Sequence, residues 1–143
     1  MAGVPSFWLL VFVAALGPIS MNGVLPANVE IMKELEVGYG QAQLVLTVFL
    51  VSMLLFQLIS GSLSDRFGRR TVVIGGLAFF VVGSLVCAFS HSIEWLLFGR
   101  FIQGAGGAVC VSMPRTMVRD SLPRDQAASA MGYLTLAMML APL

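Results

Sequence analysis

The stretch Gly61-Ser-Leu-Ser-Asp-Arg-Phe-Gly-Arg-Arg70 decides the fold of this chain. Half of its ten residues are Gly or Arg, and it lies between two long apolar runs. A short basic segment between two such runs is typical of a cytoplasmic turn that joins two membrane-spanning helices. The stretch therefore predicts a membrane protein and indicates which side of the membrane this turn faces.

The composition favours the same class. Of the 143 residues, 58% are hydrophobic and 10% are charged, whereas soluble domains carry about 25% charged residues. The net charge of +1 gives no indication of a nucleic-acid partner. Cys87 and Cys110 lie in apolar runs and are interpreted as small buried side chains. His91 has no partner at metal-ligand spacing, so we expect neither a metal nor a cofactor.

Four apolar runs are long enough to cross a bilayer, which takes about 20 residues of helix. They cover residues 7–25, 42–60, 71–89 and 93–113, and a fifth run covers residues 127–143. Backbone groups in lipid must be hydrogen-bonded internally, so these runs are expected to be helices. The sequence thus predicts an all-α membrane protein with four full spans and most of a fifth. Because the fifth run is still apolar at its end, we expect the chain to be a fragment of a longer protein.

Charges between the runs predict the orientation. The first connection carries three Glu and one Lys, a net charge of −2, and the second carries one Asp and three Arg, a net charge of +2. Of the eight basic residues, six lie in the second and fourth connections: Arg66, Arg69, Arg70, Arg115, Arg119 and Arg124. The positive-inside rule places these connections and the N-terminus in the cytoplasm. Met1 to Ser6 carry no Lys or Arg, so the first run is expected to be a retained span rather than a signal peptide.

Small residues on the third and fourth runs predict close contacts between helices, because glycine lets backbones approach in lipid. These residues are Gly75, Gly76, Gly83, Gly99, Gly104, Gly106 and Gly107. Ser92 is expected to cap the fourth helix at its N-terminus.

Arg100 is the one basic residue predicted to lie inside a span. An Arg at that depth costs about 3 kcal/mol unless it is paired or wetted. Arg100, Gln103, Gly104 and Gly107 share one helical face, as expected for a helix that lines a polar cavity. The alternative is that Arg100 snorkels to the outer interface and acts only as an anchor.

Asn22 is a second polar residue within a predicted span. It lies in Ser20-Met-Asn-Gly-Val-Leu-Pro26, near the outer end of the first run. Its amide could form a hydrogen bond within the bundle, or the helix could simply end there in a polar turn. The residues leave both interpretations open.

Four stretches of the sequence resemble a known family. Gly61-x-Leu-x-Asp-Arg-x-Gly-Arg-Arg70 is similar to the loop between helices two and three of the major facilitator superfamily. Arg100-x-x-Gln-Gly resembles the helix-four arginine motif of its drug/proton antiporters. Leu25-Pro-Ala27 and Met117-Val-Arg-Asp120 look like the Bcr/CflA-type multidrug efflux transporters.

The resemblance implies roles for the cytoplasmic residues. Gly61 and Gly68 would allow the tight turn between helices two and three, and Asp65 would face a helix end in the other half of the transporter. Arg69 would pair with Asp120 in a latch that closes the cytoplasmic side. Arg66 and Arg70 belong to the same motif, and the positive charges of this loop could equally contact lipid headgroups.

For the span residues, the resemblance implies that Arg100 and Gln103 take part in proton coupling or in substrate-linked rearrangement. In this subfamily the place of Asn22 is commonly held by Asp. An amide cannot carry a titrating proton. Either coupling uses another carboxylate, or this member is not proton-driven in the usual way.

The resemblance implies a twelve-span transporter of two six-helix halves, of which this chain is the incomplete N-terminal half. It would export drugs or other small amphipathic compounds against proton entry, by alternating access, across the inner membrane of a bacterium. Its partners would be the lipid bilayer, a small-molecule substrate and protons, and this chain alone would not transport. The alternative is a self-contained small membrane protein that acts as an oligomeric exporter or scaffold. A membrane enzyme is not expected, since the sequence shows no nucleophile, acid–base pair or metal cluster.

Overall fold

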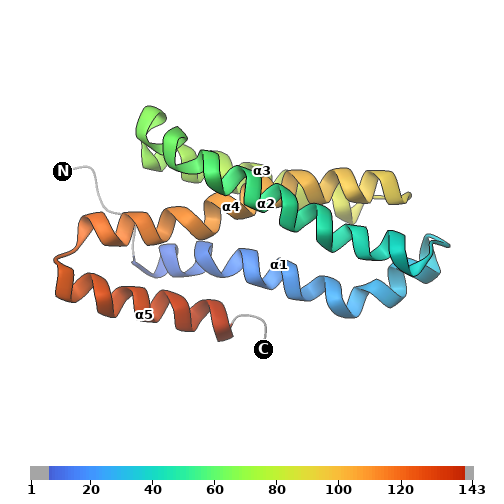
Figure 1. Cartoon of the computed structure of the whole chain (residues 1–143), viewed down its shortest axis with the longest axis horizontal. Coiled ribbons are helices and arrows are strands. Elements are labelled where there is room, and N and C mark those ends of the chain that lie inside the picture. Colours follow the sequence, from blue (N-terminus) through green and yellow to red (C-terminus); the bar gives the residue numbers. More distant parts are fainter. Residues whose placement is uncertain (1–6, 141–143) are drawn as a thin grey trace.

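The computed structural model describes the backbone of residues 7–140, and the side chains in that range except those of Phe7, Leu25, Asn28 and Asp125. Five helices form almost all of this range (Figure 1). They are α1 (Phe7–Glu34), α2 (Tyr39–Phe67), α3 (Arg69–Ala88), α4 (Ile93–Ser121) and α5 (Arg124–Leu140). The predicted all-α membrane fold is thereby confirmed, and the last part of the predicted fifth span, residues 141–143, lies outside the described residues.

The helices extend further than the apolar runs. Among the described residues, α2, α3 and α4 are long and apolar enough to cross a membrane, and α1 holds a shorter apolar stretch, Trp8–Val24. Helix α1 does not end near residue 25 but continues through Pro26 to Glu34. Helix α4 likewise continues through Pro114 to Ser121. A proline removes only one backbone donor, and neighbouring helices and local adjustment can compensate for it in a membrane bundle.

Helix α4 forms the centre of the bundle. It packs against each of the other four helices, and most extensively against α2 and α3. Every residue from 103 to 111 is buried, whereas the other helices each leave a large part of their apolar surface exposed. An apolar surface exposed in this way suits contact with lipid, or with further helices.

Glycines explain how closely the helices approach α4. A side-chain carbon at Gly106 would lie 2.4 Å from the backbone nitrogen of Phe80, and one at Gly104 would lie 2.5 Å from the backbone oxygen of Phe49. Gly76, Gly83 and Gly99 are equally confined, so the prediction of close contacts is confirmed for these five glycines. It is wrong for Gly75, where an added carbon would meet nothing within 4 Å. A side-chain carbon at Gly107 would lie 3.5 Å from the Phe49 ring, an ordinary contact distance.

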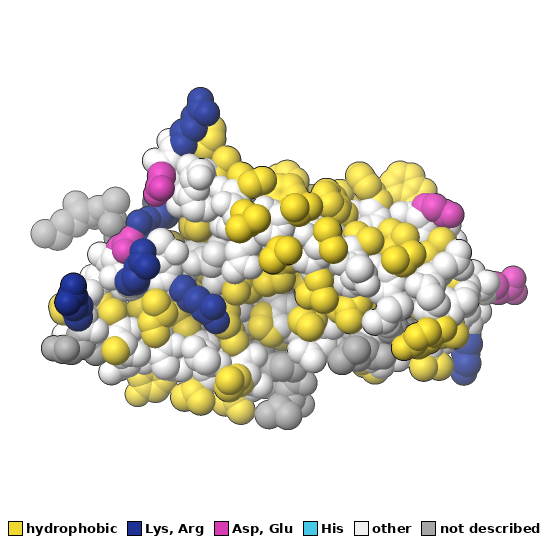
Figure 2. Space-filling model, in the orientation of Figure 1, with side chains coloured by type: hydrophobic (Ala, Val, Ile, Leu, Met, Phe, Trp, Pro, Cys, Tyr) yellow, Lys and Arg dark blue, Asp and Glu magenta, His cyan; other side chains and the backbone are white. Residues whose placement is uncertain are grey.

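The connections alternate between the two ends of the bundle. The α2–α3 and α4–α5 connections lie at one end, and the α1–α2 and α3–α4 connections lie at the other (Figure 1). Figure 2 shows that most Lys and Arg side chains on the visible face gather at the first of these ends. At the other end, Ser92 caps α4 as predicted, accepting a hydrogen bond from the backbone N–H of Trp95 at 3.5 Å.

Candidate functional site

A buried amide joins three helices in the interior of the bundle. Gln103 of α4 is only 6% exposed. Its side-chain nitrogen donates to the hydroxyl of Ser84 on α3 at 2.8 Å and to the hydroxyl of Ser20 on α1 at 3.4 Å. Its side-chain oxygen accepts from Nη1 of Arg100 at 2.9 Å. Both ends of the amide are thus used, as expected for a polar group without access to water.

Arg100 is held by this network but not saturated by it. Its Nη1 donates to Gln103, while its buried Nε has no hydrogen-bond partner among the described residues. Arg100 lies seven residues after the first residue of α4, about 10 Å along the helix axis. A guanidinium carries five N–H donors, so Arg100 has donors to offer to a ligand or to a further part of the protein.

Close packing of α3 on α4 places Ser84 beside Gln103. A side-chain carbon at Gly83 would lie 2.4 Å from the backbone nitrogen of Gln103 and 2.7 Å from its Cα. The two backbones therefore touch at this level, and the residue after Gly83 reaches the amide of Gln103. The Ser84 hydroxyl in turn donates to the carbonyl of Phe80 at 2.8 Å, which fixes it as the acceptor for Gln103.

Asn22 is not among the hydrogen-bonding partners of this amide. Its side-chain nitrogen donates to the carbonyl of Pro18 at 3.0 Å, within α1. The interpretation of a helix ending near Asn22 is wrong, because α1 continues to Glu34. Helix α1 reaches Gln103 through Ser20, which lies two residues earlier and faces the bundle interior.

The shared face predicted for Arg100, Gln103, Gly104 and Gly107 is divided between neighbouring helices. Gly104 is packed against the backbone of α2 at Phe49, and Gly107 contacts the Phe49 ring. Both glycines are buried within the part of the chain that the structure describes. The physical reason is that glycine on a central helix is most useful where another backbone must approach it.

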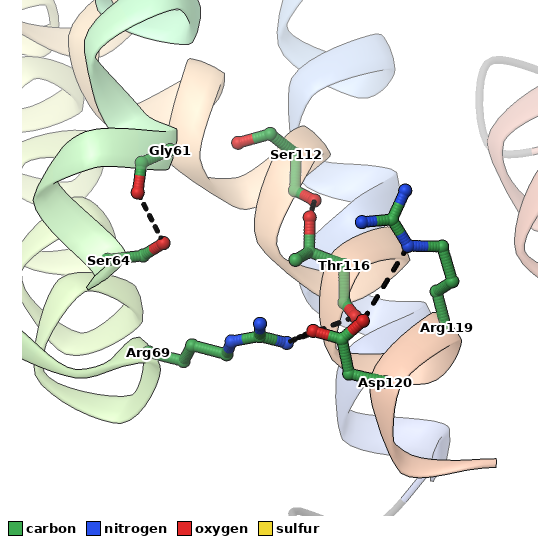
Figure 3. A network of polar contacts seen from close by, with 7 residues as sticks. All are labelled: Gly61, Ser64, Arg69, Ser112, Thr116, Arg119 and Asp120. Atoms are coloured by element: carbon green, nitrogen blue, oxygen red, sulfur yellow. Dashed lines mark hydrogen bonds and ion pairs between the residues drawn. The ribbon is translucent and has the colours of Figure 1, made fainter.

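A second polar cluster lies at the end of the bundle where the basic residues gather (Figure 3). Arg69, the first residue of α3, forms an ion pair through Nη1 with Oδ2 of Asp120 near the end of α4. The same Nη1 also donates to the carbonyl of Thr116 at 3.2 Å. Nε of Arg119 approaches the other carboxylate oxygen of Asp120 at 3.6 Å. The Arg69 and Asp120 side chains are 34% and 36% exposed, so water reaches this pair.

A single residue makes the turn that brings Arg69 to Asp120. Gly68 separates α2 from α3 and has a φ of +83°, which residues with a side chain rarely adopt. The expectation that Gly61 shares in this turn is wrong. Gly61 lies inside α2, where its carbonyl accepts a hydrogen bond from the Ser64 hydroxyl at 2.7 Å, and an added carbon there would meet nothing within 4 Å.

The other charged residues of this motif point to the surface. Asp65, Arg66 and Arg70 are exposed. The Arg66 guanidinium lies 5.5 Å from the centre of the Phe67 ring. The structure therefore brings Arg69 and Asp120 together, and leaves Asp65, Arg66 and Arg70 available for contacts outside the described residues.

Sequence reasoning missed Ser20 and Ser84. Single serines are common in membrane helices and often bond to their own backbone. Ser60 and Ser112 do so here, although their hydroxyls also lie 3.2 Å apart across α2 and α4. The sequence could have indicated the role of Ser84, because this residue follows a glycine on the third predicted span. Small residues mark the level at which two helices meet, so a polar neighbour of such a glycine is well placed to bond across helices.

Comparison with known proteins assigns the family. The model of the Major Facilitator Superfamily matches residues 7–143. The chain is 32% identical over 135 residues to multidrug resistance protein D of Escherichia coli, covering 94% of this chain and 34% of that protein. It is 34% identical over 139 residues to a bicyclomycin resistance protein homolog of Haemophilus influenzae, covering 93% of this chain and 35% of that protein. It is 34% identical over 119 residues to a multidrug resistance protein MdtL of Klebsiella pneumoniae, covering 83% and 30%.

These matches confirm the family resemblance noted from the motifs, including its multidrug efflux branch. The chain belongs to the Major Facilitator Superfamily, a family of multi-pass membrane transporters. It spans about a third of the length of the curated relatives it matches.

Proposed function

We propose that the protein exports drugs or other small amphipathic compounds from a bacterial cytoplasm across the inner membrane, driven by proton entry and operating by alternating access. The relatives named for multidrug and bicyclomycin resistance support export of such compounds. The observation that carries the proposal is the Gln103 network, which holds a cation inside a helical bundle of a transporter family. A polar group kept at that depth is costly and is a sign of function in membrane proteins.

In this proposal Arg100 is the residue that senses the state of the transport site. Gln103 aims the guanidinium through one hydrogen bond and leaves its other donors for substrate, for water or for a carboxylate elsewhere in the protein. Asn22 cannot bind and release a proton at physiological pH. In this proposal the proton is therefore carried by a carboxylate elsewhere in the protein, not by residue 22. Arg100 responds electrostatically when that carboxylate is neutralised by protonation.

The Arg69–Asp120 pair is the proposed cytoplasmic latch. It joins the start of α3 to the end of α4 through two different acceptors, the Asp120 carboxylate and the Thr116 carbonyl. Asp65, on the same motif as Arg69, is exposed and would meet the positive end of a helix from the second half of the transporter. Because water reaches the pair, it can break and re-form at a small cost in free energy as the cytoplasmic side opens and closes.

The proposed orientation has the N-terminus and the α2–α3 and α4–α5 connections in the cytoplasm. It rests on the separation of charge seen in Figure 2 and on the positive-inside rule. In a variant without Cys87 and Cys110, a single cysteine at the exposed position Ser121 should react with an impermeant maleimide only from the cytoplasm. One at Tyr39, which is 68% exposed at the other end, should react only from outside. Labelling of Tyr39→Cys from the cytoplasm alone would contradict the orientation.

The transport proposal is tested with the full-length protein in inverted membrane vesicles. An imposed proton gradient should drive accumulation of a fluorescent amphipathic cation in vesicles that contain the protein. Collapse of the gradient by a protonophore should abolish it. Accumulation that survives the protonophore, or that equals the level in vesicles without the protein, would overturn proton-coupled export. The alternative of a self-contained scaffold predicts no accumulation in either condition.

A further inference from the structure

An apolar groove runs along the outside of the bundle between α2 and α3. Its volume is about 290 Å³. Its walls and floor include Phe56, Leu63 and Phe67 of α2, Gly75 and Phe79 of α3, and Val109 of α4. Apart from Thr71 near one end, no polar side chain lines it within the part of the chain that the structure describes. The groove therefore suits an apolar occupant.

The groove exists because α2 and α3 pack on α4 far more than on each other. Gly75 and Gly76 show the two roles that adjacent glycines have there. A carbon at Gly76 would lie 2.5 Å from Val109, so this residue seats α3 on α4. A carbon at Gly75 would meet nothing within 4 Å, and Gly75 lines the groove. Gly75 is thus not needed for a helix contact, and its missing side chain keeps the groove wide.

The length of the groove indicates what kind of apolar molecule fits. On α2 its walls extend from Phe67 to Phe56, eleven residues apart, or about 16 Å along the helix. The hydrocarbon core of one leaflet is about 15 Å thick, half of the whole core. One acyl chain from a single leaflet matches the observed length.

Positive charge lies at the end of the groove that meets the helix connection. Phe67 forms part of the wall, and the guanidinium of Arg66 lies 5.5 Å from the centre of its ring. Arg70 is exposed and directly precedes Thr71, which also lines the groove. Asp65 is the acidic residue nearby in the chain, and Arg69 is engaged by Asp120. Two free guanidiniums against one carboxylate favour an anionic headgroup over a zwitterionic one.

We propose that this groove binds one anionic phospholipid from the leaflet next to the α2–α3 connection. Its acyl chain lies along Phe56, Leu63 and Gly75, and its phosphate lies between Arg66 and Arg70. The site is separate from the Gln103 network, so its occupancy can be tested without any transport measurement. Bound lipid would brace α2 and α3 on each side of the Gly68 turn.

The test uses the full-length protein in nanodiscs that contain a trace of phosphatidylglycerol with a photoreactive group in its acyl chain. Illumination followed by peptide mapping should place the label on the groove segments around Phe56, Leu63 and Phe79. Unlabelled phosphatidylglycerol should compete for this labelling, and phosphatidylcholine should compete poorly. Removing one arginine, in Arg66→Gln or Arg70→Gln, should weaken competition by phosphatidylglycerol about fivefold, and removing both should weaken it about 25-fold.

Gly75→Leu places a side chain in the groove and should reduce groove labelling at least fivefold, because a side-chain carbon at Gly75 would meet nothing within 4 Å. Its matched control is Val82→Phe, which adds bulk at an exposed position of the same helix outside the groove and should leave labelling unchanged. Arg124→Gln, an exposed basic residue at the same end of the bundle, is the control for charge. If Gly75→Leu does not purify as a single species, Thr71→Leu fills the same groove from its open end.

Equal competition by the two lipids, or full labelling in both groove-filling variants, would overturn the proposal. So would cross-linking of a cysteine at Gly75 to another helix of the same protein, because the groove would then be a helix-packing site. Saturable labelling that prefers phosphatidylglycerol and is lost with Gly75→Leu would support it.

Discussion

The two polar centres of this molecule differ in their access to water. Gln103 is 6% exposed, and in the bundle interior it forms hydrogen bonds with side chains that belong to three helices. The Arg69–Asp120 pair, in contrast, is about one-third exposed at the helix ends. In lipid an unpaired polar group cannot form a hydrogen bond with water instead, so the loss of any hydrogen bond of Gln103 costs free energy. At the helix ends water and headgroups compete with the ion pair, so the pair is weak and reversible. The interior network therefore suits a fixed geometry, and the pair suits a contact that opens and closes.

The largest effect is expected at Arg100. In the full-length transporter, Arg100→Ala should abolish proton-driven export in vesicles, because no neutral side chain supplies the guanidinium's charge and donors. Arg100→Lys should retain only part of the activity, since an ammonium lacks the planar fork that binds Gln103 while keeping other donors free. Activity is measured at matched protein levels. If Arg100 only anchored the helix by snorkelling, Lys would replace it fully, so an unimpaired Arg100→Lys variant would contradict the interior role.

Gln103 should come next. Gln103→Ala removes the partner of Arg100 and leaves the hydroxyls of Ser20 and Ser84 without their donor. We expect export to fall about tenfold, since a hydrogen bond contributes about 1–1.5 kcal/mol. The thermal unfolding temperature in detergent should fall as well. Gln103→Leu is the comparison of similar size, and full activity in it would show that the amide only fills space.

The Arg69–Asp120 pair should have a smaller effect. Arg69→Ala or Asp120→Ala should lower the export rate about fivefold and leave membrane insertion intact, as expected for a contact worth at most about 1 kcal/mol. The exchange Arg69→Asp with Asp120→Arg should restore part of the rate. Recovery should be incomplete, because an aspartate at residue 69 cannot donate to the Thr116 carbonyl. A double variant no better than either single variant would count against a direct pairing.

High salt offers a sharper contrast between the two centres. A rise from 0.05 to 0.5 M salt shortens the screening length from about 14 Å to about 4 Å. The rate difference between the native protein and Arg69→Ala should therefore shrink in high salt. The difference between the native protein and Gln103→Ala should not change, because ions do not enter the bundle interior. Equal salt sensitivity of both differences would contradict the distinction drawn here.

The smallest effects should separate the two serines. Ser84→Ala removes a bond of 2.8 Å to Gln103 and should lower export about threefold, whereas Ser20→Ala removes a bond of 3.4 Å and should change it by less than half that factor. Ser62→Ala, at an exposed position of α2, is the control. If Ser20→Ala were the more damaging change, the amide of Gln103 would be oriented mainly by α1 rather than by α3.

Several features of this protein follow from local patterns in the sequence. Apolar runs of about 20 residues predict helices because lipid leaves the backbone no other way to satisfy its hydrogen bonds. The Gly68 turn and the cap at Ser92 depend on a few neighbouring residues. The turn lies where the loop motif predicted it, and the cap lies at the serine that was expected to form it. The ends of the helices were less predictable, because apolar content ends at the membrane surface while α1, α2 and α4 continue beyond it.

The pairing of Arg69 with Asp120 was suggested by a motif rather than by local physics. Their opposite charges and shared membrane face made the contact possible, and the packing of α3 on α4 brings the two side chains together. Gly61 and Gly75 show the limit of such reasoning. Both were expected to serve a turn or a close contact, and both instead lie where an added carbon meets open space.

The sequence by itself determined the membrane class, the helices, the sites of the turns and the separation of charge, because each depends on residues close together in the chain. Only the tertiary structure decided that Gln103 meets Ser84 and Ser20, that Asn22 turns back onto its own helix, and that Gly104 is covered by α2. These pairings depend on the rotation and axial shift of each helix against α4. That geometry is set by which small residues let two backbones touch, and no single segment contains this information.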